Sequence, residues 1–298
     1  MHDIILDLDT GIDDALALAC VLSCSSELNL LAVSTTFGNV STRTSCRNSA
    51  ALLHHLGCDD IPVVTGSRCP LVSHEVYEAS AYQHRIHGEN GIGGVDLPPF
   101  DECIISEDVV AFYDRILHMH EDVTLVTTGP MTNLAAFLMS RPDRMFSRVV
   151  SMGGAVYTDG NITPWAEANI YKDTRAASIV LDSVPNLVLV PLDVTQTLFL
   201  SKEETGKWND GQYRTMTGFY IAFHGGDRCY LHDPTTIAYL AHPQLFKTEM
   251  LSLEVVQDGQ RKGNLARRQP GNGIDVVVSC NADAVQTFLY DAWKRILC

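Results

Sequence analysis

Four aspartates lie within eight residues near the start of the chain, in the run Asp7-Leu8-Asp9-Thr10-Gly11-Ile12-Asp13-Asp14. The apolar residues 4–6 before the run are typical of a buried strand, and residues 14–22 are typical of a helix. Gly11 supplies the turn, and the last two aspartates fall in the first helical turn, where the helix dipole favours carboxylates. The run therefore predicts a strand–turn–helix unit with its acids at the carboxyl end of the strand. In open α/β sheets this edge is where ligands bind.

The crowding of these acids also constrains their chemistry. Carboxylates this close together disfavour each other's ionised forms unless a positive charge lies among them. A hard divalent metal is the simplest such charge. The alternative is that Asp13 only caps the helix and Asp7 is only a loop acid, but a cap needs one aspartate rather than four.

Composition restricts the class of protein. A chain of 298 residues with 46% hydrophobic and 19% charged side chains can bury roughly three quarters of its unfolded surface, so we expect one domain over residues 1–298. The 21 basic and 36 acidic side chains give a net charge of -15. This charge disfavours nucleic acid and anionic membranes as partners, so a neutral small molecule is the expected ligand.

Cysteine usage and the apolar segments bear on location. The nine cysteines are odd in number and include no CxxC pair, which indicates reduced thiols. We find neither a cleavable leader nor an apolar run of membrane-spanning length. We therefore expect a cytoplasmic protein.

Strand-like and helix-like segments alternate along most of the chain, which predicts an α/β fold with an open, mostly parallel sheet flanked by helices. Strand-like runs follow at residues 30–36, 61–64, 123–128, 149–153 and 187–191, and helical patterns at residues 43–56, 107–120, 131–139, 173–181, 234–241 and 282–296. Two stretches do not fit this alternation. Residues 66–100 form a long Gly-, Pro- and His-containing segment, and a loop of this length is usually functional. Residues 257–273 carry glycines and basic side chains, and we interpret them as an exposed hairpin or loop with a solvated surface.

Further polar clusters follow predicted strands, where distant parts of the sequence can converge. Thr127-Thr128-Gly129 and Gly38-Asn39 each end a strand, and a backbone carbonyl exposed there is a good ligand for a hard cation. Asn161, Glu167 and Asn169 lie close in sequence and suit a hydroxyl-rich ligand. In His232-Asp233-Pro234, we expect Asp233 at the N-cap and Pro234 at the first position of a helix.

Taken together, these segments resemble the nucleoside hydrolase family, of the inosine-uridine preferring or pyrimidine type, from residue 4 to about residue 240. The matching blocks, in the family's order, are Asp7 to Asp14 (DxDxGxDD), Thr35 to Asn39, Ile86 to Gly91, Leu125 to Gly129, Met152 to Gly154, Asn161 with Glu167 and Asn169, and His232 to Pro234. The resemblance implies the nucleoside hydrolase fold, with a Rossmann-like core. It also implies hydrolysis of ribonucleosides to ribose and free base, and a homodimer or homotetramer.

The resemblance assigns roles to individual residues. It implies a calcium ion held by Asp9, Asp14, the Thr128 main-chain carbonyl and Asp233, with Asp7 supporting the metal shell. It implies that Asp9 is also the general base for the attacking water. The residues implied to bind the substrate, mostly its ribose, are Asp13, Asn39, His87, Met152, Asn161, Glu167 and Asn169. The chemistry would resemble inverting glycoside hydrolysis, with nearby carboxylates stabilising a ribosyl cation-like transition state.

The leaving group and one departure from the family pattern leave questions open. His232 is the expected proton donor to the departing base, with His87 and either Tyr220 or Tyr230 as further candidates for contacts to it. The family usually has phenylalanine where this chain has Ala168. The 5' side of the ribose pocket is therefore either wider or filled by Trp165.

Two alternative functions remain at this stage. Asp7-Leu8-Asp9-Thr10 after an apolar strand also resembles the nucleophile motif of haloacid-dehalogenase-type phosphatases, although that reading leaves Asp13-Asp14 and His232-Asp233 unexplained. The second alternative is a non-catalytic, calcium-dependent nucleoside-binding protein. Every acid that the hydrolase mechanism requires is present, which argues against it.

Overall fold

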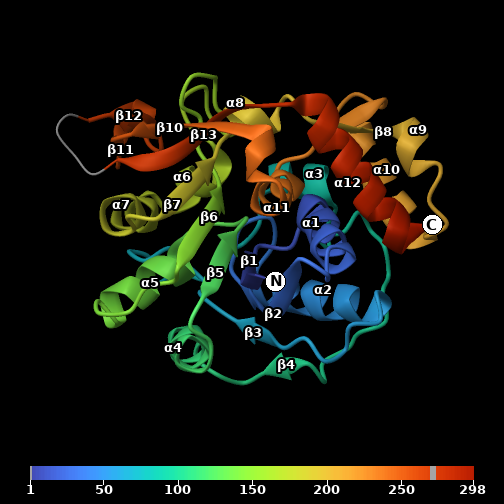
Figure 1. The fold of residues 1–298 in the computed structure, drawn as a ribbon, viewed down its shortest axis with the longest axis horizontal. Helices are drawn as coiled ribbons and strands as arrows, with labels where there is room; N and C mark the ends of the chain where they lie inside the picture. Colours follow the sequence, from blue (N-terminus) through green and yellow to red (C-terminus); the bar gives the residue numbers. More distant parts are fainter. Residues whose placement is uncertain (1, 269–272) are drawn as a thin grey trace.

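The computed structural model of the protein describes residues 2–268 and 273–298. Its centre is a nine-stranded sheet of order β10-β13-β7-β6-β5-β1-β2-β3-β4 (Figure 1). The strands are β1 (His2–Leu8), β2 (Leu28–Thr35), β3 (Val63–Thr65), β4 (Ile104–Ile105), β5 (Val123–Thr127), β6 (Arg148–Met152), β7 (Leu187–Val190), β10 (Phe246–Leu251) and β13 (Ile274–Cys280). Neighbours are parallel except for β10, which is antiparallel to β13. The mostly parallel sheet expected from the sequence is thus confirmed.

The order of the strands creates a crevice beside β1. The chain places β2, β3 and β4 on one side of β1, and then returns to add β5, β6 and β7 on the other side. In the β1–β5 pair, Asp7 is in register with Thr127. Successive strands are therefore added in one direction from β1 to β4 and in the opposite direction from β5 to β7. This change of direction beside β1 is the point where open α/β sheets bind their ligands.

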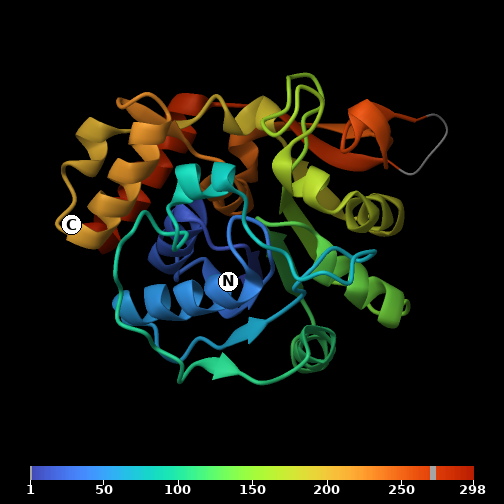
Figure 2. The same ribbon diagram turned by 180° about the vertical axis from the view of Figure 1, so that it is seen from behind.

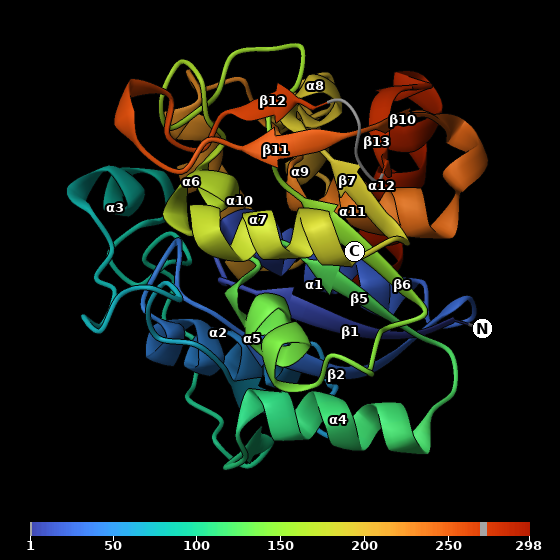
Figure 3. The same cartoon turned by 90° about the vertical axis from the view of Figure 1, so that its left-hand side faces the viewer.

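Helices cover both faces of the sheet. The helices α1 (Ile12–Ser23), α2 (Thr42–His55), α10 (Gly211–Phe223), α11 (Asp233–Ala241) and α12 (Ala282–Leu297) contribute to one apolar core, and α4 (Val109–Met119), α5 (Thr132–Ser140) and α7 (Thr174–Ser183) contribute to the other (Figures 1 and 3). Strand β1 joins the two cores because Ile4 and Leu6 face the first and Ile5 faces the second. A strand buried on both faces reads as an uninterrupted apolar run, as the sequence does here.

The predicted helices are confirmed, with small differences at their ends, but the start of α11 differs in a way that matters. His232 is the N-cap residue of α11, and Asp233 is its first helical residue. The expected N-cap role of Asp233 is therefore wrong. Pro234 still lies in the first turn, where its missing N–H costs no hydrogen bond. Because the Asp233 carboxylate does not cap its own helix, it is available to the crevice.

The segment 66–100 is more ordered than a loop. It contains α3 (Ala81–His87), which begins with a capping box in which Ser80 and Gln83 each accept from the other's backbone N–H. This helix packs against α10 (Figure 2). The sequence did not predict this helix, because a helix of barely two turns shows too little apolar periodicity to be recognised.

The segment 257–273 is part of a hairpin formed by β11 (Leu253–Val255) and β12 (Leu265–Arg267), and its residues 269–272 lie outside the described residues. The expected exposed hairpin is confirmed, since residues 257–261 and Arg267 are exposed, but its basic side chains also make contacts that the sequence did not predict. The side chains of Arg261, Lys262 and Arg267 lie over the rings of Trp165, Tyr171 and Tyr157 respectively.

The remaining short elements are α6 (Ala168–Lys172), α8 (Leu192–Thr195), α9 (Lys202–Thr205), β8 (Phe199–Ser201), β9 (Arg228–Tyr230), and the 3-10 turns Pro243–Leu245 and Gly259–Arg261. All nine cysteines are free. Among the described helices, each is too short or too polar to cross a membrane.

Candidate active site

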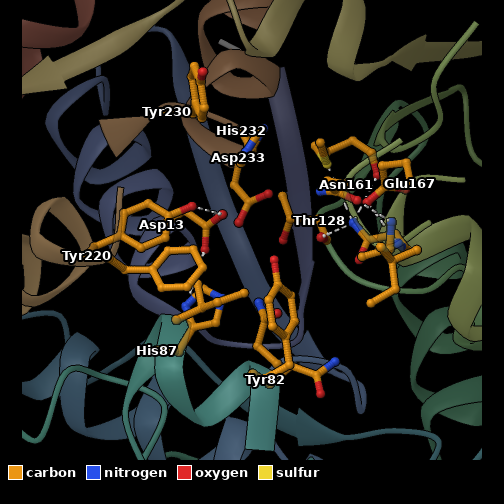
Figure 4. A pocket seen from close by; sticks show the side chains of 18 of the residues that line it. Asp13, Tyr82, His87, Thr128, Asn161, Glu167, Tyr220, Tyr230, His232 and Asp233 are labelled. Carbon is orange, nitrogen blue, oxygen red and sulfur yellow. Dashed lines mark hydrogen bonds and ion pairs between the residues drawn. The ribbon is translucent and has the colours of Figure 1, made fainter. Parts of the chain in front are cut away.

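A cavity of ≈ 260 Å³ opens at the carboxyl ends of β1, β5 and β6. Ten of the residues singled out in the sequence line it: Asp13, Asn39, His87, Thr128, Met152, Asn161, Glu167, Asn169, His232 and Asp233. In Figure 4, Asp13, Thr128 and Asp233 lie at the centre, Asn161 and Glu167 on one side, and His87 and Tyr220 on the other. Asp7, Asp9 and Asp14 lie behind this lining and are fully buried. The sequence blocks therefore converge as predicted.

Asp7 lies beneath the site. Its Oδ1 accepts hydrogen bonds from Ser34 Oγ at 2.8 Å and from Asn133 Nδ2 at 2.7 Å. Burial raises the pKa of Asp7 to about 6, although both hydrogen bonds lower it. These contacts tie Asp7 to the strand and helix beside β1, which fits a supporting position.

Asp9 is held from two directions. The backbone N–H of Asn39 donates to Asp9 Oδ2 at 2.8 Å, and the Asn39 side-chain amide donates to Oδ1 at 3.0 Å. Gly38 permits this approach, because a Cβ there would fall 1.9 Å from Asp9 Oδ2. Burial raises the pKa of the Asp9 carboxyl, while the nearby ammonium group of Lys172 opposes this.

Asp13, Asp14 and Asp233 form a compact group, with a carboxylate oxygen of each within 4.8 Å of the others. Asp14 accepts from Thr128 Oγ1 at 2.6 Å and from the backbone N–H of Gly11 at 2.7 Å. Burial and mutual repulsion raise the pKa of all three carboxyls, that of Asp13 to about 6. Asp13 Oδ1 is buried without a hydrogen-bond partner in the described chain. An all-oxygen group with an unused buried oxygen fits a hard cation such as calcium.

The side of the pocket expected to bind ribose is organised by Glu167. Its carboxylate accepts from three backbone N–H groups, those of Gly154, Asn169 and Ile170, at 2.8–3.1 Å. Asn169 Nδ2 donates to the carbonyl oxygen of Thr128 at 2.7 Å. Asn161, which is exposed, accepts from the N–H of Ala168 at 2.9 Å. These bonds fix α6 against the end of β5.

Three histidines line the pocket, His87, His224 and His232, and burial lowers the pKa of each of them. Burial lowers the pKa of His87 and of His232 to about 3. His87 Nδ1 accepts from the N–H of Ile12 at 3.2 Å, so its 4.0 Å approach to Asp13 Oδ1 brings two acceptors together and is not an ion pair. His232 Nδ1 lies 2.8 Å from the hydroxyl of Thr195, which leaves Nε2 for a ligand.

An aromatic wall faces the ribose side. The ring of Tyr220 stacks on His87 at 5.6 Å, and its hydroxyl donates to Asp13 Oδ2 at 3.4 Å. Tyr230 packs against His232 with ring centroids 5.8 Å apart. The wall also contains Tyr82, Phe223 and His224, which the sequence analysis did not single out; they lie in α3, at the end of α10 and directly after it.

Trp165 does not fill the space beside Ala168. Ala168 lines the cavity, whereas Trp165 lies outside the lining. Its indole is 43% exposed and carries the guanidinium of Arg261 on its face at 4.3 Å. Trp165 therefore packs against the hairpin and does not fill the pocket.

Lys172 is the charged residue that sequence reasoning missed. Its Nζ donates to Asp9 Oδ2 at 3.2 Å and to Asn39 Oδ1 at 3.5 Å. Burial disfavours the ammonium form, but attraction to Asp9 outweighs this and raises the pKa of Lys172. One signal was available: Lys172 follows Asn169 by three residues, a spacing that places both on one face of a helix.

The fold and the pocket define an α/β protein with a buried, acidic, oxygen-rich ligand site beside β1, and comparison with known proteins gives the family. The sequence model described as "Inosine-uridine preferring nucleoside hydrolase" matches residues 4–287. The chain therefore belongs to the nucleoside hydrolase family and is a ribonucleoside hydrolase, an N-glycosidase.

Individual relatives agree with this assignment. The chain is 35% identical to uridine nucleosidase 1 of Arabidopsis thaliana over 82% of this chain and 75% of that protein. It is 36% identical to the pyrimidine-specific ribonucleoside hydrolase RihA of Citrobacter koseri over 82% and 81% of the two chains. Among solved structures, the purine-preferring ribonucleoside hydrolase from Gardnerella vaginalis superposes with a TM-score of 0.92 at 32% identity, over 99% of both chains. The recognised family and fold class are thus confirmed.

Proposed function

We propose that this enzyme hydrolyses the N-glycosidic bond of ribonucleosides with the help of bound calcium, giving ribose and free base. The supporting observation is the buried group of Asp13, Asp14 and Asp233, with oxygens within 4.8 Å of one another. Of these, Asp14 and Asp233 are proposed to bind the metal, and Asp13, whose Oδ1 is unpartnered in the described chain, is proposed to bind the ribose beside it. A cation bound there would neutralise the acids and polarise the attacking water and the ribose hydroxyls.

The proposed ligands are Asp9, Asp14, Asp233 and the Thr128 carbonyl. Three are buried carboxylates at the carboxyl ends of strands or the starts of helices. The Thr128 carbonyl already accepts from Asn169, but a carbonyl oxygen has a second lone pair for a cation. Asp7 would support this shell, since its Oδ1 is bonded to Ser34 and Asn133.

Asp9 is the proposed general base. Asn39 binds both of its oxygens and so fixes the orientation of the carboxylate. In the proposed step, Asp9 takes a proton from the water that attacks the anomeric carbon of ribose. The bond to the base is already largely broken when the water attacks, and the surrounding carboxylates would stabilise the positive charge on the sugar. The base would leave with the bonding electron pair and take up one proton, which balances the proton that Asp9 takes from the water.

The remaining lining would bind the substrate. Asp13, Asn39, Asn161, Glu167 and Asn169 are the proposed partners of the ribose hydroxyls, with Met152 beside the sugar. The aromatic wall and His87 would contact the base, and His232 Nε2 would donate a hydrogen bond to it as it leaves. The relatives' names divide between uridine, pyrimidines and purines, so both kinds of base belong in a test. The homo-oligomer and the cytoplasmic location stay predictions.

The test is an assay for ribose release. The purified protein is incubated with uridine, cytidine, inosine, adenosine and guanosine, in calcium and after chelation. We expect reducing sugar from at least one nucleoside, and loss of turnover on chelation. Asp9→Asn should lower kcat by about 10² to 10⁴, the usual contribution of a general base. The matched control is Asp3→Asn at the other end of β1, where Asp3 binds Asn29 and His120 and lies outside the cavity lining.

Each part of the proposal has an opposing result. Full activity after chelation would reject the metal. Full activity of Asp9→Asn would reject the base assignment. Release of inorganic phosphate from sugar phosphates, without ribose release from nucleosides, would favour the phosphatase reading. Binding of ribosides in calcium without turnover of any would favour the non-catalytic one.

A further inference from the structure

Lys172 occupies an unusual position for a cation. It ends α6, and its side chain is only 6% exposed. Its Nζ lies 3.2 Å from Asp9 Oδ2, the same oxygen that accepts from the backbone N–H of Asn39. The ammonium group therefore binds the carboxylate that is proposed both as metal ligand and as general base.

Lys172 is the one permanently charged cation of the described pocket lining. It is the one lysine or arginine among the described residues that line the cavity. The three histidines of the lining, His87, His224 and His232, are disfavoured as cations because burial lowers the pKa of each, that of His87 and of His232 to about 3. The buried acids facing this single positive charge are Asp9, Asp13, Asp14, Glu167 and Asp233. In the metal-free protein, Lys172 thus carries the positive charge nearest to this acidic group.

The lysine is also held in place. Glu167 caps α6 by accepting from the backbone N–H groups of Asn169 and Ile170, and it ties the helix to the end of β6 by accepting from that of Gly154. Asn169 ties the same helix to Thr128. Burial of the aliphatic stem leaves the ammonium little freedom to withdraw into solvent. A cation arriving beside Asp9 therefore meets a fixed positive charge in a poorly solvated site, where charge–charge repulsion is stronger than in water.

We propose that Lys172 is an internal counter-ion of Asp9 that competes with the divalent cation for this carboxylate, so that it stabilises the metal-free protein and weakens calcium binding. The inference rests on the proposed function only in requiring that a divalent cation bind beside Asp9. It makes Lys172 a positioning residue that sets metal affinity.

The test measures calcium affinity directly, by calorimetric titration, together with the melting temperature in chelator and in calcium. The variants are Lys172→Met, which keeps the aliphatic stem, and Lys172→Gln, which keeps a neutral donor. We expect both to bind calcium about tenfold more tightly or better, the usual size of coupling between two sites. In chelator both should melt below the wild type, and calcium should raise their melting temperatures by more.

The matched control is Lys262→Met. Lys262 lies on the nearby hairpin, where its Nζ sits over the Tyr171 ring at 4.6 Å and outside the cavity lining. Removing this charge should leave calcium affinity unchanged. Calcium binding by both Lys172 variants that is equal to or weaker than that of the wild type would overturn the inference, even if the wild type binds calcium and releases ribose. Binding by the variants but not by the wild type would support it, and binding by none of the proteins would overturn both the inference and the proposed metal.

Discussion

His232 shows how burial sets the chemistry of a single residue in this pocket. Its pKa, lowered to about 3, makes the ring neutral under ordinary conditions. A neutral imidazole carries one N–H, and the Thr195 hydroxyl at Nδ1 can fix that proton on Nε2. The side chain can therefore stabilise a departing base through a hydrogen bond without first taking up a proton.

This role predicts that His232→Ala will affect substrates unequally. Natural nucleosides need help to release the base, so kcat should fall by about 10² to 10⁴. A riboside of nitrophenol has a leaving group that departs unaided, so the kcat of His232→Ala on this substrate should fall far less. Steady-state kinetics on both substrates measure the difference. Equal losses would show that His232 does not assist the leaving group, and His242→Ala, at the other end of α11, should change neither rate.

For single residues, the sequence predicts side chains that lie together because they are adjacent along the chain. It misses pairs of side chains that only folding brings together. The acids of the first motif could be placed together because a strand, a turn and a helix fix their spacing. Lys172 could not be assigned, because its partner Asp9 is 163 residues away. The cap of α11 was misplaced by one residue, since the Asp233 carboxylate turns into the pocket and does not bond its own helix.

Among the secondary-structure elements, the hairpin of β11 and β12 makes packing contacts that the sequence did not predict. Its basic side chains lie on the aromatic rings of residues 157–171, the segment that carries Asn161, Glu167 and Asn169. Asn264 also donates to the Trp165 carbonyl at 3.2 Å. The hairpin therefore packs on the outside of the substrate-binding segment and holds it against the sheet.

Two glycines of the hairpin allow this packing to be tested. Both have left-handed backbones, with φ of +81° at Gly263 and +71° at Gly259. A Cβ on Gly263 would lie 2.9 Å from the Ala166 Cβ and 3.0 Å from the Tyr171 Cα, whereas a Cβ on Gly259 would have nothing within 4 Å. Alanine at either site should cost about 1 to 2 kcal/mol for the backbone conformation.

Gly263→Ala should cost about 1 to 3 kcal/mol more than Gly259→Ala, because it alone forces the two segments apart. It should also raise KM for nucleosides, since the asparagines that face the ribose shift with their segment. Denaturant unfolding and steady-state kinetics of the two variants check this. Equal stabilities and equal KM values would mean that the hairpin does not position the substrate-binding segment.

The sequence predicted the long elements well because their apolar periodicity extends over several turns or a whole buried strand. It missed α3 and α10, and three rings of the aromatic wall, those of Tyr82, Phe223 and His224. Helix α3 is short. Helix α10 carries Thr215, Thr217 and Gly218, which weaken its helical signal. The hairpin was recognised, but its basic residues were interpreted as solvated because cation–ring contacts depend on tertiary packing.

For the whole molecule, the position of the site follows from the order of the strands. The alternation of strands and helices predicted a parallel sheet and hence a ligand edge, but neither the reversal beside β1 nor the C-terminal edge was predicted. That edge is made by β13, parallel to β7, and by the antiparallel β10. These pairings join segments far apart in the chain, which local patterns do not encode.

The C-terminal helix links this edge of the molecule to the site. Trp293 of α12 is fully buried, and its indole N–H donates to the Leu16 carbonyl of α1 at 2.9 Å. Its ring also packs edge-on against Trp208 at 5.9 Å. Because α1 carries Asp13 and Asp14 in its first turn, Trp293 supports the helix that presents the acidic group, and does so at Leu16, two residues after Asp14.

Trp293→Ala should therefore lower the free energy of unfolding by about 3 to 5 kcal/mol, the usual cost of truncating a large buried aromatic side chain. The same change at the partly exposed Trp165 should cost less than about 1 kcal/mol, because removing its side chain leaves little buried cavity. Denaturant unfolding monitored by far-UV circular dichroism compares the two. At a temperature well below its transition, Trp293→Ala should still release ribose, since Trp293 lies outside the cavity lining. Equal losses of stability in the two variants would contradict a core that depends on the contact between α1 and α12.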